Sequence, residues 1–179
     1  MEKPVLLLDM DEVVVDFTNA WIQRFYNKTG ITLNRDDWKA WDLKRILPEK
    51  VFDGFVSTLR EPGFFRDLPP MVGAIEGIKE LHDYYDIVFL TASSQYAYND
   101  KFQWIEENLS FVNKPNLILT HRKDLVIGEY LVDDAPHNLI HSPAKTKIVF
   151  DAPWNRDLTL FTRVSNWDQL TRLLKPKNE

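Results

Sequence analysis

The feature that most constrains the fold is a short apolar run near the start of the chain, Val5-Leu6-Leu7-Leu8, which leads directly into Asp9 and Asp11. Such a run is typical of a buried parallel strand, and parallel strands carry functional groups at their carboxyl ends. In an extended chain, residues two apart point to the same side, so a cation could lie against both carboxylates. Two buried charges without a partner would be unfavourable. The pattern therefore indicates either a solvated loop or a reactive site.

Apolar runs of the same kind recur along the chain and alternate with segments of helical periodicity. Besides residues 5–8, the predicted strands are residues 87–90, 117–119, 130–132 and 147–150. The predicted helices are residues 17–26, 74–85, 98–109 and 167–174, the last with Asn166 as its N-cap. Strands that alternate with helices in this way indicate an α/β fold with a parallel sheet and right-handed crossovers.

Residues from about Gly30 to Pro70 have no strand pattern, and they alternate short charged turns with aromatic side chains. Ten of the 23 aromatic residues lie between positions 17 and 65. Several of them are expected to form a small helical core, because large aromatic side chains are mostly buried. The alternative is that one or two of them line a pocket and stack on a flat ligand, since aromatic faces bind bases well.

The composition argues against several classes of protein. A net charge of −5 disfavours binding to nucleic acid polymers or anionic membranes, and the absence of cysteine excludes disulfides and thiol catalysis. No apolar run approaches the roughly 20 residues of a transmembrane helix, and the amino terminus lacks the layout of a signal peptide. We therefore expect a cytoplasmic protein of one domain, with or without a modest insertion. The sequence is compatible with a homo-oligomer.

Polar residues recur at the carboxyl ends of four predicted strands. In chain order they are Asp9, Asp11, Thr91, Lys123, Asp133 and Asp134. Each has a simple structural explanation, as a helix cap, a surface charge or the start of a turn. However, the carboxyl ends of parallel strands meet at one edge of the sheet, where ligands bind. Four such coincidences in succession favour a functional site.

These residues supply what phosphoryl transfer requires: a nucleophile, ligands for a divalent cation, and donors for the phosphate oxygens. Mg²⁺ prefers oxygen ligands and keeps several waters, so two or three carboxylates suit it. We expect Asp9 to attack phosphorus and form an aspartyl-phosphate, and Asp11 to protonate the leaving alcohol and then activate the hydrolytic water. Lys123 is expected to neutralise charge on the phosphate and on Asp9, and Thr91 to donate its hydroxyl.

The order Asp-x-Asp, Thr, Lys, Asp-Asp resembles the haloacid dehalogenase (HAD) superfamily of phosphotransferases over nearly the whole chain. Within that superfamily the chain is most similar to the 5'(3')-deoxyribonucleotidases. The segments that carry this closer resemblance are Asp9-Met10-Asp11 with the following valines and Asp16-Phe17, then Phe64-Phe65, Leu90-Thr91, Leu119-Thr120-x-x-Lys123 and Leu131-Val132-Asp133-Asp134.

The resemblance implies a HAD-like α/β fold, in which residues 1–17 and 71–179 form a Rossmannoid parallel sheet flanked by helices. Residues 18–70 then correspond to a small helical cap inserted after the first strand. The resemblance also implies a magnesium-dependent phosphatase that hydrolyses deoxyribonucleoside monophosphates through an aspartyl-phosphate intermediate.

The same resemblance assigns roles to individual residues. Asp9 is the nucleophile and a metal ligand, and Asp11 is the acid/base, with its backbone carbonyl on Mg²⁺. One of Asp133 and Asp134 is the other protein ligand, and the family uses the second of the pair. Phe17 falls where the family places an aromatic ring against the base. The candidate substrate-binding residues are Phe17, Trp41, Ala92 and His121.

Three positions depart from the pattern of these families. Glu12 stands where the superfamily usually has glycine and adds a charge near the entrance of the site. Ala92 stands where the family often has serine, a hydroxyl that Ser93 or Ser94 could replace. Ala135 stands where the vertebrate-type members carry arginine, so one cation for the phosphate is missing.

Two alternatives to a nucleotidase remain open. One keeps the chemistry but acts on another small phosphate ester, because the cap alone sets the substrate and the fold does not decide it. The other is a phospho-receiver signalling module, which also combines an acidic pair, a phosphorylated aspartate, a threonine and a lysine on a parallel sheet. The chain order argues against a receiver, because its phosphorylated aspartate comes after the acidic pair and it needs no aromatic insertion.

Other residues near the predicted edge have structural interpretations. His137 and His141 have the i, i+4 spacing of two zinc ligands on one helix face. Without a matching zincin pattern we favour helix packing or a surface turn for them. Trp154 and Asn155 follow the last predicted strand and are interpreted as structural support.

Overall fold

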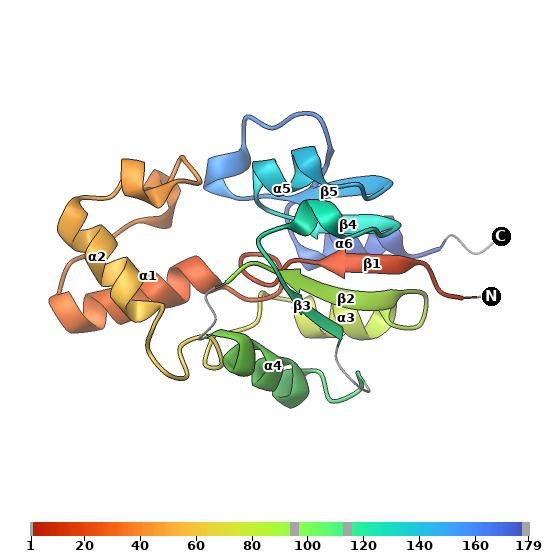
Figure 1. The fold of residues 1–179 in the computed structure, drawn as a ribbon, viewed down its shortest axis with the longest axis horizontal. Coiled ribbons are helices and arrows are strands. Elements are labelled where there is room, and N and C mark those ends of the chain that lie inside the picture. Colours follow the sequence, from red (N-terminus) through yellow and green to blue (C-terminus); the bar gives the residue numbers. More distant parts are fainter. Residues whose placement is uncertain (1, 94–96, 113–115, 177–179) are drawn as a thin grey trace.

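The computed structural model describes residues 2–93, 97–112 and 116–176, and within them the strands form one six-stranded parallel sheet (Figure 1). The strands are β1 (Val5–Leu8), β2 (Asp86–Thr91), β3 (Asn116–Leu119), β4 (Tyr130–Asp133), β5 (Thr146–Phe150) and β6 (Thr162–Val164). Their order is β3-β2-β1-β4-β5-β6, and every neighbouring pair is parallel. The succession of strands therefore reverses direction at β1, which is where open parallel sheets bind ligands.

The helices of the described residues are α1 (Phe17–Thr29), α2 (Glu49–Thr58), α3 (Ala74–Leu81), α4 (Ala97–Asn108), α5 (Pro136–His141) and α6 (Trp167–Leu174). The four predicted helices, α1, α3, α4 and α6, lie close to their expected positions, whereas α2 and α5 were not predicted. Short 3₁₀ helices are η1 (Arg35–Asp37), η2 (Leu43–Arg45), η3 (Lys123–Leu125) and η4 (Pro153–Asn155). The Asn166 side chain accepts a hydrogen bond from the Gln169 N–H and caps α6, as predicted. No helix within the described ranges is long and apolar enough to cross a membrane.

The predicted α/β fold is confirmed, and the structure adds elements that the sequence did not predict. β6 has three residues, of which only Val164 is buried, so it contains no apolar run. α2 buries Val51 and Thr58 and half-buries Phe52, Phe55 and Val56, so its apolar residues lie at the i, i+1, i+4 and i+5 positions of one helix face. β6 therefore lacks the periodic pattern on which sequence-based prediction depends, whereas α2 has a helical pattern that the prediction missed.

The sheet separates two apolar cores, because successive residues of a strand point to opposite faces. Leu6 and Leu8 lie in the larger core together with buried residues of α3, α4 and α6, whereas Leu7 lies in the smaller core with α5. The buried Trp167 indole of α6 donates a hydrogen bond of 2.7 Å to the Val13 carbonyl. Helix α6 thereby holds in place the loop that carries the predicted catalytic residues.

That loop is a tight turn and not a continuation of β1. The Met10 carbonyl accepts hydrogen bonds from the N–H groups of Val14 and Val15, at 2.8 and 2.9 Å. Within the turn Glu12 has a φ of +64°, the one positive φ found at a non-glycine residue in the described part of the chain. This left-handed conformation costs about 1–2 kcal/mol for a residue with a Cβ.

The segment between this loop and α3 lies beyond the carboxyl ends of the strands (Figure 1). The rings of Trp21 and Phe25 stack at a centroid distance of 5.0 Å, and Trp38 packs against Trp21 at 5.5 Å. All three side chains are buried, so the predicted aromatic core is confirmed. Helix α1 runs three residues further than predicted and ends at Thr29, before Gly30, whose φ is +70°. We propose that this segment, residues 18–70, acts as a cap over the carboxyl edge of the sheet.

Candidate active site

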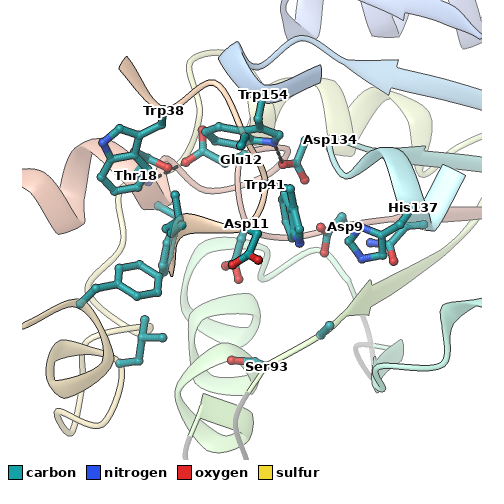
Figure 2. Close-up of a pocket in the computed structure, with 18 of the residues that line it drawn as sticks. Asp9, Asp11, Glu12, Thr18, Trp38, Trp41, Ser93, Asp134, His137 and Trp154 are labelled. Atoms are coloured by element: carbon teal, nitrogen blue, oxygen red, sulfur yellow. Dashed lines mark hydrogen bonds between the residues drawn. The ribbon is translucent and has the colours of Figure 1, made fainter. Parts of the chain in front are cut away.

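A cavity of about 610 Å³ lies at the carboxyl edge of the sheet, between the loop after β1 and the cap (Figure 2). Its polar wall includes four of the predicted catalytic or metal-binding residues, namely Asp9, Asp11, Lys123 and Asp134. Its aromatic wall is formed by Phe17, Trp38, Trp41, Phe52, Phe55, Phe65 and Trp154. A cavity of this size, apolar over much of its wall and with a few converging polar groups, is typical of a small-molecule site.

Lys123 is the centre of a buried ionic cluster. Its ammonium lies 2.9 Å from Asp9 Oδ1 and 2.7 Å from Asp133 Oδ2, and only 2% of its side chain is exposed. Burial lowers the pKa of Lys123, but the carboxylates of Asp133 and Asp9 more than offset this and raise its pKa above the usual value. Lys123 therefore stays charged at neutral pH and fixes the Asp9 carboxylate, as predicted from its position after β3.

The neighbouring carboxylates at the end of β4 differ in their contacts. Asp133 accepts hydrogen bonds on both oxygens: Oδ1 from the Ala135 N–H at 2.8 Å, and Oδ2 from Lys123 at 2.7 Å. Asp134 Oδ2 accepts a hydrogen bond of 2.8 Å from the Trp154 indole N–H. Asp134 Oδ1 is buried and has no hydrogen-bond partner among the described residues. Asp134 therefore has one oxygen left for a ligand, whereas Asp133 does not.

The donor set fits a divalent cation. Oxygens of Asp9, Asp133 and Asp134, all buried, lie within 4.8 Å of one another. Burial raises the pKa of Asp134 well above its usual value, and the nearby carboxylates, Asp133 first, raise it further. A buried carboxylate oxygen without a partner is unfavourable unless a proton or a cation satisfies it, and oxygen ligands are those that Mg²⁺ prefers. Neither His137 nor His141 belongs to this group of ligands.

Asp11 is held by a cation that was not among the predicted site residues. Lys101 of α4 donates hydrogen bonds to Asp11 Oδ2 at 2.8 Å and to Thr91 Oγ1 at 2.7 Å. Burial raises the pKa of Asp11 and is the largest effect, although Lys101 counteracts it. Thr91 is fully buried behind the cavity wall, and its hydroxyl reaches Asp11 only through Lys101.

A signal for Lys101 was present in the sequence. Ala97, Lys101, Trp104 and Ile105 are the buried residues of α4, at the i, i+4, i+7 and i+8 positions of one helix face. A lysine in the middle of an apolar stripe is unusual, because lysine is almost never fully buried without a partner. Such a position indicates a buried acidic partner, here Asp11.

The candidate substrate-binding residues all line the cavity. Phe17 packs against Phe55, Phe64 and Phe65, so much of its ring is already in contact with the cap. Trp41 is 46% exposed. Its ring packs against those of His137 and Trp154, at centroid distances of 5.3 and 6.0 Å. Ala92 and His121 lie near the polar wall together with Ser93, whereas Ser94 lies outside the described residues.

The residues after β5 support the site as predicted. The Asn155 side-chain amide donates hydrogen bonds of 2.8 Å to the carbonyls of Asp134 and Phe150, and its carbonyl accepts one from the Ala152 N–H. These contacts fix the backbone of the segment that carries Asp134, while Trp154 fixes the Asp134 side chain.

Comparison with known proteins agrees with the motifs. Residues 3–178 match the sequence model of the family described as 5' nucleotidase, deoxy (pyrimidine), cytosolic type C protein. The 5'(3')-deoxyribonucleotidase of Clostridium acetobutylicum is 31% identical over 167 residues, 93% of this chain and 92% of that protein. The 5'(3')-deoxyribonucleotidase of Bacillus subtilis is 29% identical over 174 residues, 96% of this chain and 99% of that protein.

A solved structure supports the fold. A HAD hydrolase from Bacillus subtilis, crystallised with bound magnesium, superposes with a TM-score of 0.61 at 12% identity, covering 98% of this chain and 100% of that one. The likeness establishes a HAD-like architecture for the chain.

Proposed function

Since the chain belongs to the 5' nucleotidase, deoxy (pyrimidine), cytosolic type C family, we propose that it hydrolyses deoxyribonucleoside monophosphates with Mg²⁺ through an aspartyl-phosphate. It is a phosphomonoester hydrolase of the HAD superfamily. The observation that carries the proposal is a single cavity in which Asp9, Asp11, Lys123 and Asp134 face an aromatic wall. The polar residues suit a phosphate, and the aromatic wall suits a base.

Asp9 is the proposed nucleophile because its carboxylate is fixed through one oxygen only. Asp9 Oδ1 accepts hydrogen bonds from the Met10 N–H at 2.8 Å and from Lys123 at 2.9 Å. Oδ2 is then the atom that attacks phosphorus. Attack forms the bond between Oδ2 and phosphorus and breaks the bond to the leaving alcohol. Lys123 offsets the negative charge that Asp9 and the phosphate bring together.

Asp11 is the proposed proton carrier. A general acid at neutral pH needs a carboxyl whose pKa lies above the usual range, and burial raises the pKa of Asp11 in this direction. Asp11 gives its proton to the leaving alcohol and then takes one from the water that attacks the aspartyl-phosphate. This second step releases phosphate and regenerates Asp9. Lys101 holds the Asp11 side chain toward the cavity throughout.

The residues that would hold Mg²⁺ are Asp9, Asp134 and the backbone carbonyl of Asp11. When bound, the ion supplies positive charge that offsets the phosphate and brings its oxygens into position. The buried, unpartnered Oδ1 of Asp134 supports Asp134 over Asp133 as the ligand, because the oxygens of Asp133 are already engaged.

A panel of phosphate esters tests the substrate assignment. Phosphate release is measured with Mg²⁺ from 5'- and 3'-deoxyribonucleotides, ribonucleotides, sugar phosphates and amino-acid phosphates. We expect deoxyribonucleotides to be hydrolysed. Hydrolysis of sugar phosphates without nucleotides would contradict the nucleotide assignment and favour the second candidate, a phosphatase for another small ester. Chelation is expected to stop turnover and added Mg²⁺ to restore it.

Two substitutions test the roles of residues at either wall. Asp9→Asn is expected to abolish turnover in a folded protein, and retained activity would refute the nucleophile assignment.

Trp41→Ala is expected to raise KM for nucleotides about tenfold, because base stacking is worth about 1–3 kcal/mol, and to leave KM for an aryl phosphate unchanged. Tyr26→Ala is the control, since Tyr26 is equally exposed at 47% but lies outside the cavity wall. Equal effects of Trp41→Ala on both substrates would argue against stacking.

We also propose a cytoplasmic location, which the description of the family as cytosolic supports. The expected partner is a small phosphomonoester and not a nucleic acid polymer, because a cavity of about 610 Å³ suits a single nucleotide.

A further inference from the structure

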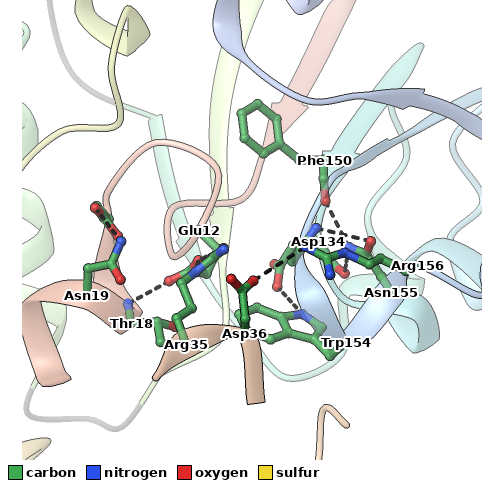
Figure 3. Close-up of polar contacts among 12 residues, drawn as sticks. Glu12, Thr18, Asn19, Arg35, Asp36, Asp134, Phe150, Trp154, Asn155 and Arg156 are labelled. Carbon is green, nitrogen blue, oxygen red and sulfur yellow. Dashed lines mark hydrogen bonds and ion pairs between the residues drawn. The ribbon is translucent and has the colours of Figure 1, made fainter. Parts of the chain in front are cut away.

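Glu12 is a buried acid that the proposed mechanism does not use. Only 3% of it is exposed, and both carboxylate oxygens are engaged (Figure 3). Oε1 accepts the Thr18 N–H at 2.6 Å, and Oε2 accepts Nε and Nη2 of Arg35 at 3.1 and 2.5 Å. The backbone at this position would favour glycine, since φ is +64°. The contacts of the side chain, and not the turn, therefore account for a glutamate here.

Arg35 connects two parts of the molecule. It belongs to η1 of the cap, yet its guanidinium pairs with Glu12 in the loop after β1. The same guanidinium lies over the Trp154 ring, 5.4 Å from its centroid. Trp154 lies in η4, which follows β5 of the sheet. A single cap residue therefore contacts both a catalytic loop and an aromatic ring of the core.

The Trp154 ring leads on to the proposed metal ligand. Its indole N–H donates to Asp134 Oδ2 at 2.8 Å, and the other oxygen of Asp134 has no partner among the described residues. A second cap residue, Trp41, packs edge-on against the same ring at a centroid distance of 6.0 Å. Two cap side chains thus contact the indole whose N–H orients Asp134.

We propose that Glu12 is a positioning residue that couples the cap to the metal site. By pairing with Arg35 it keeps the guanidinium on Trp154, and Trp154 in turn holds Asp134 with Oδ1 turned to the cation. The inference rests on the proposed function, in that Asp134 is taken as a metal ligand. Coupling of this kind is reciprocal: a ligand that draws the cap onto Trp154 strengthens cation binding, and the cation strengthens binding of that ligand by the same factor.

The structure offers a matched control for this connection. Asp36, the neighbour of Arg35 in η1, pairs with Arg156 beside η4 at 3.4 Å (Figure 3). This pair also joins the cap to the core, but its side chains are 66% and 56% exposed. Exposed ion pairs contribute little. Asp36→Asn therefore removes a tie between cap and core without disturbing the path through Trp154.

The test is calorimetric titration of metal-free protein with Mg²⁺ alone. We expect Glu12→Gly, Arg35→Met and Trp154→Phe each to raise the Kd for Mg²⁺ about tenfold, the lower end of the effect of residues that orient metal ligands. Asp36→Asn is expected to stay within about twofold of wild type. Glu12→Gly is suited to the turn and should fold. The double variant Glu12→Gly/Arg35→Met should bind no more weakly than either single one, because both act through one path.

A kinetic measurement separates positioning from general damage. At saturating Mg²⁺, kcat of Glu12→Gly on an aryl phosphate is expected to return to near the wild-type value, which a structural defect would not allow. Unchanged Mg²⁺ affinity in folded Glu12→Gly and Arg35→Met would overturn the inference, as would an equal loss in Asp36→Asn. The titration contains no nucleotide, so its result does not depend on which phosphate ester is the substrate. Wild-type protein that binds no Mg²⁺ would instead contradict the proposed function as well.

Discussion

Replacing Lys123 with methionine removes the charge that offsets two buried carboxylates. Methionine is similar in length and apolar, so the substitution deletes the ammonium with little change in packing. In the wild type this ammonium lies 2.9 Å from Asp9 and 2.7 Å from Asp133. Its pKa is raised because these carboxylates outweigh the effect of burial, so the charge is present throughout the neutral range. We expect the loss to appear first in the free energy of unfolding.

The size of this loss follows from the spacing of the charges. One oxygen each of Asp9 and Asp133 lie within 4.8 Å of each other. Two like charges at that distance repel by about 3.5 kcal/mol at an effective dielectric constant of about 20. The protein can escape the repulsion by binding a proton, which at pH 7 costs about 4 kcal/mol relative to the unfolded chain, where the carboxyl has its ordinary pKa. The two estimates agree, so Lys123→Met should lower the free energy of unfolding by about 3–4 kcal/mol at pH 7.

The pH dependence of this effect has a definite sign. In Lys123→Met, the carboxyl that takes the proton has a higher pKa in the folded protein than in the unfolded chain. Its contribution to stability is fully present below the unfolded pKa and is lost as the pH rises through the folded pKa. At pH 5 the proton costs only about 1.5 kcal/mol, so the destabilisation should be smaller there than at pH 7. Urea unfolding of wild type and Lys123→Met, both in chelator at the two pH values, measures the difference.

The double variant Lys123→Met/Asp133→Asn separates stability from activity. It removes one of the repelling carboxylates while asparagine keeps an acceptor for the Ala135 N–H, so most of the stability should return while phosphate release stays lost. A loss below about 1 kcal/mol for Lys123→Met, an equal loss at both pH values, or a double variant as unstable as the single one would each refute the reasoning.

Three further predictions concern packing and hydrogen bonds. Lys101→Met leaves Asp11 without its 2.8 Å partner and should lower kcat about 100-fold, with phosphate release as the measurement. Gly77→Ala would place a Cβ 2.5 Å from Trp167 Cε3, so thermal unfolding should show a loss of about 1–3 kcal/mol despite the helix propensity of alanine. Burial raises the pKa of Tyr85 to about 12. Because the unfolded chain loses this proton at a lower pH than the folded protein does, the protein should become less stable as the pH rises from about 10 to 12. Tyr85→Phe should remove that dependence in urea unfolding and cost about 1 kcal/mol at pH 8.

The sheet and its polar edge could be predicted because they depend on local patterns. An apolar run followed by a polar residue marks the carboxyl end of a strand, and parallel strands bring all such ends to one edge. Asp9, Lys123 and Asp133 therefore meet in space although more than 100 residues separate the first from the other two. Their proximity could be predicted from the strand pattern alone, without knowledge of any side-chain contact.

The cap and its contacts could not be predicted in the same way. Which face of Phe17 or Trp41 is covered depends on rings from distant segments, such as Phe65 and Trp154, that no local spacing reveals. The role of Glu12 likewise depends on Arg35, 23 positions further along the chain. Tertiary packing, and not propensity, decides these contacts.

The acidic pair at the end of β4 leads to a last prediction. Asp133 is the final residue of β4 and Asp134 follows it; their side chains contact different partners, Lys123 and Trp154 respectively. Burial raises the pKa of Asp133 to about 6 even though Lys123 counteracts it. Asp133 is nevertheless paired with that cation, so Asp133→Asn leaves Lys123 without one of its two carboxylates and should destabilise metal-free protein by about 2–3 kcal/mol. Asp134 is buried with one unpartnered oxygen, and burial raises its pKa.

Asp134→Asn should therefore stabilise metal-free protein by about 1–2 kcal/mol at pH 7 while abolishing Mg²⁺ binding, because it removes a buried charge that only a cation satisfies. Urea unfolding in chelator and calorimetric titration with Mg²⁺ measure the two effects. If both substitutions destabilised the protein equally, the unpartnered oxygen would not be a ligand position. Opposite signs at adjacent residues would show that the site keeps Asp134 for metal binding at a cost in stability, while Asp133 contributes to the fold.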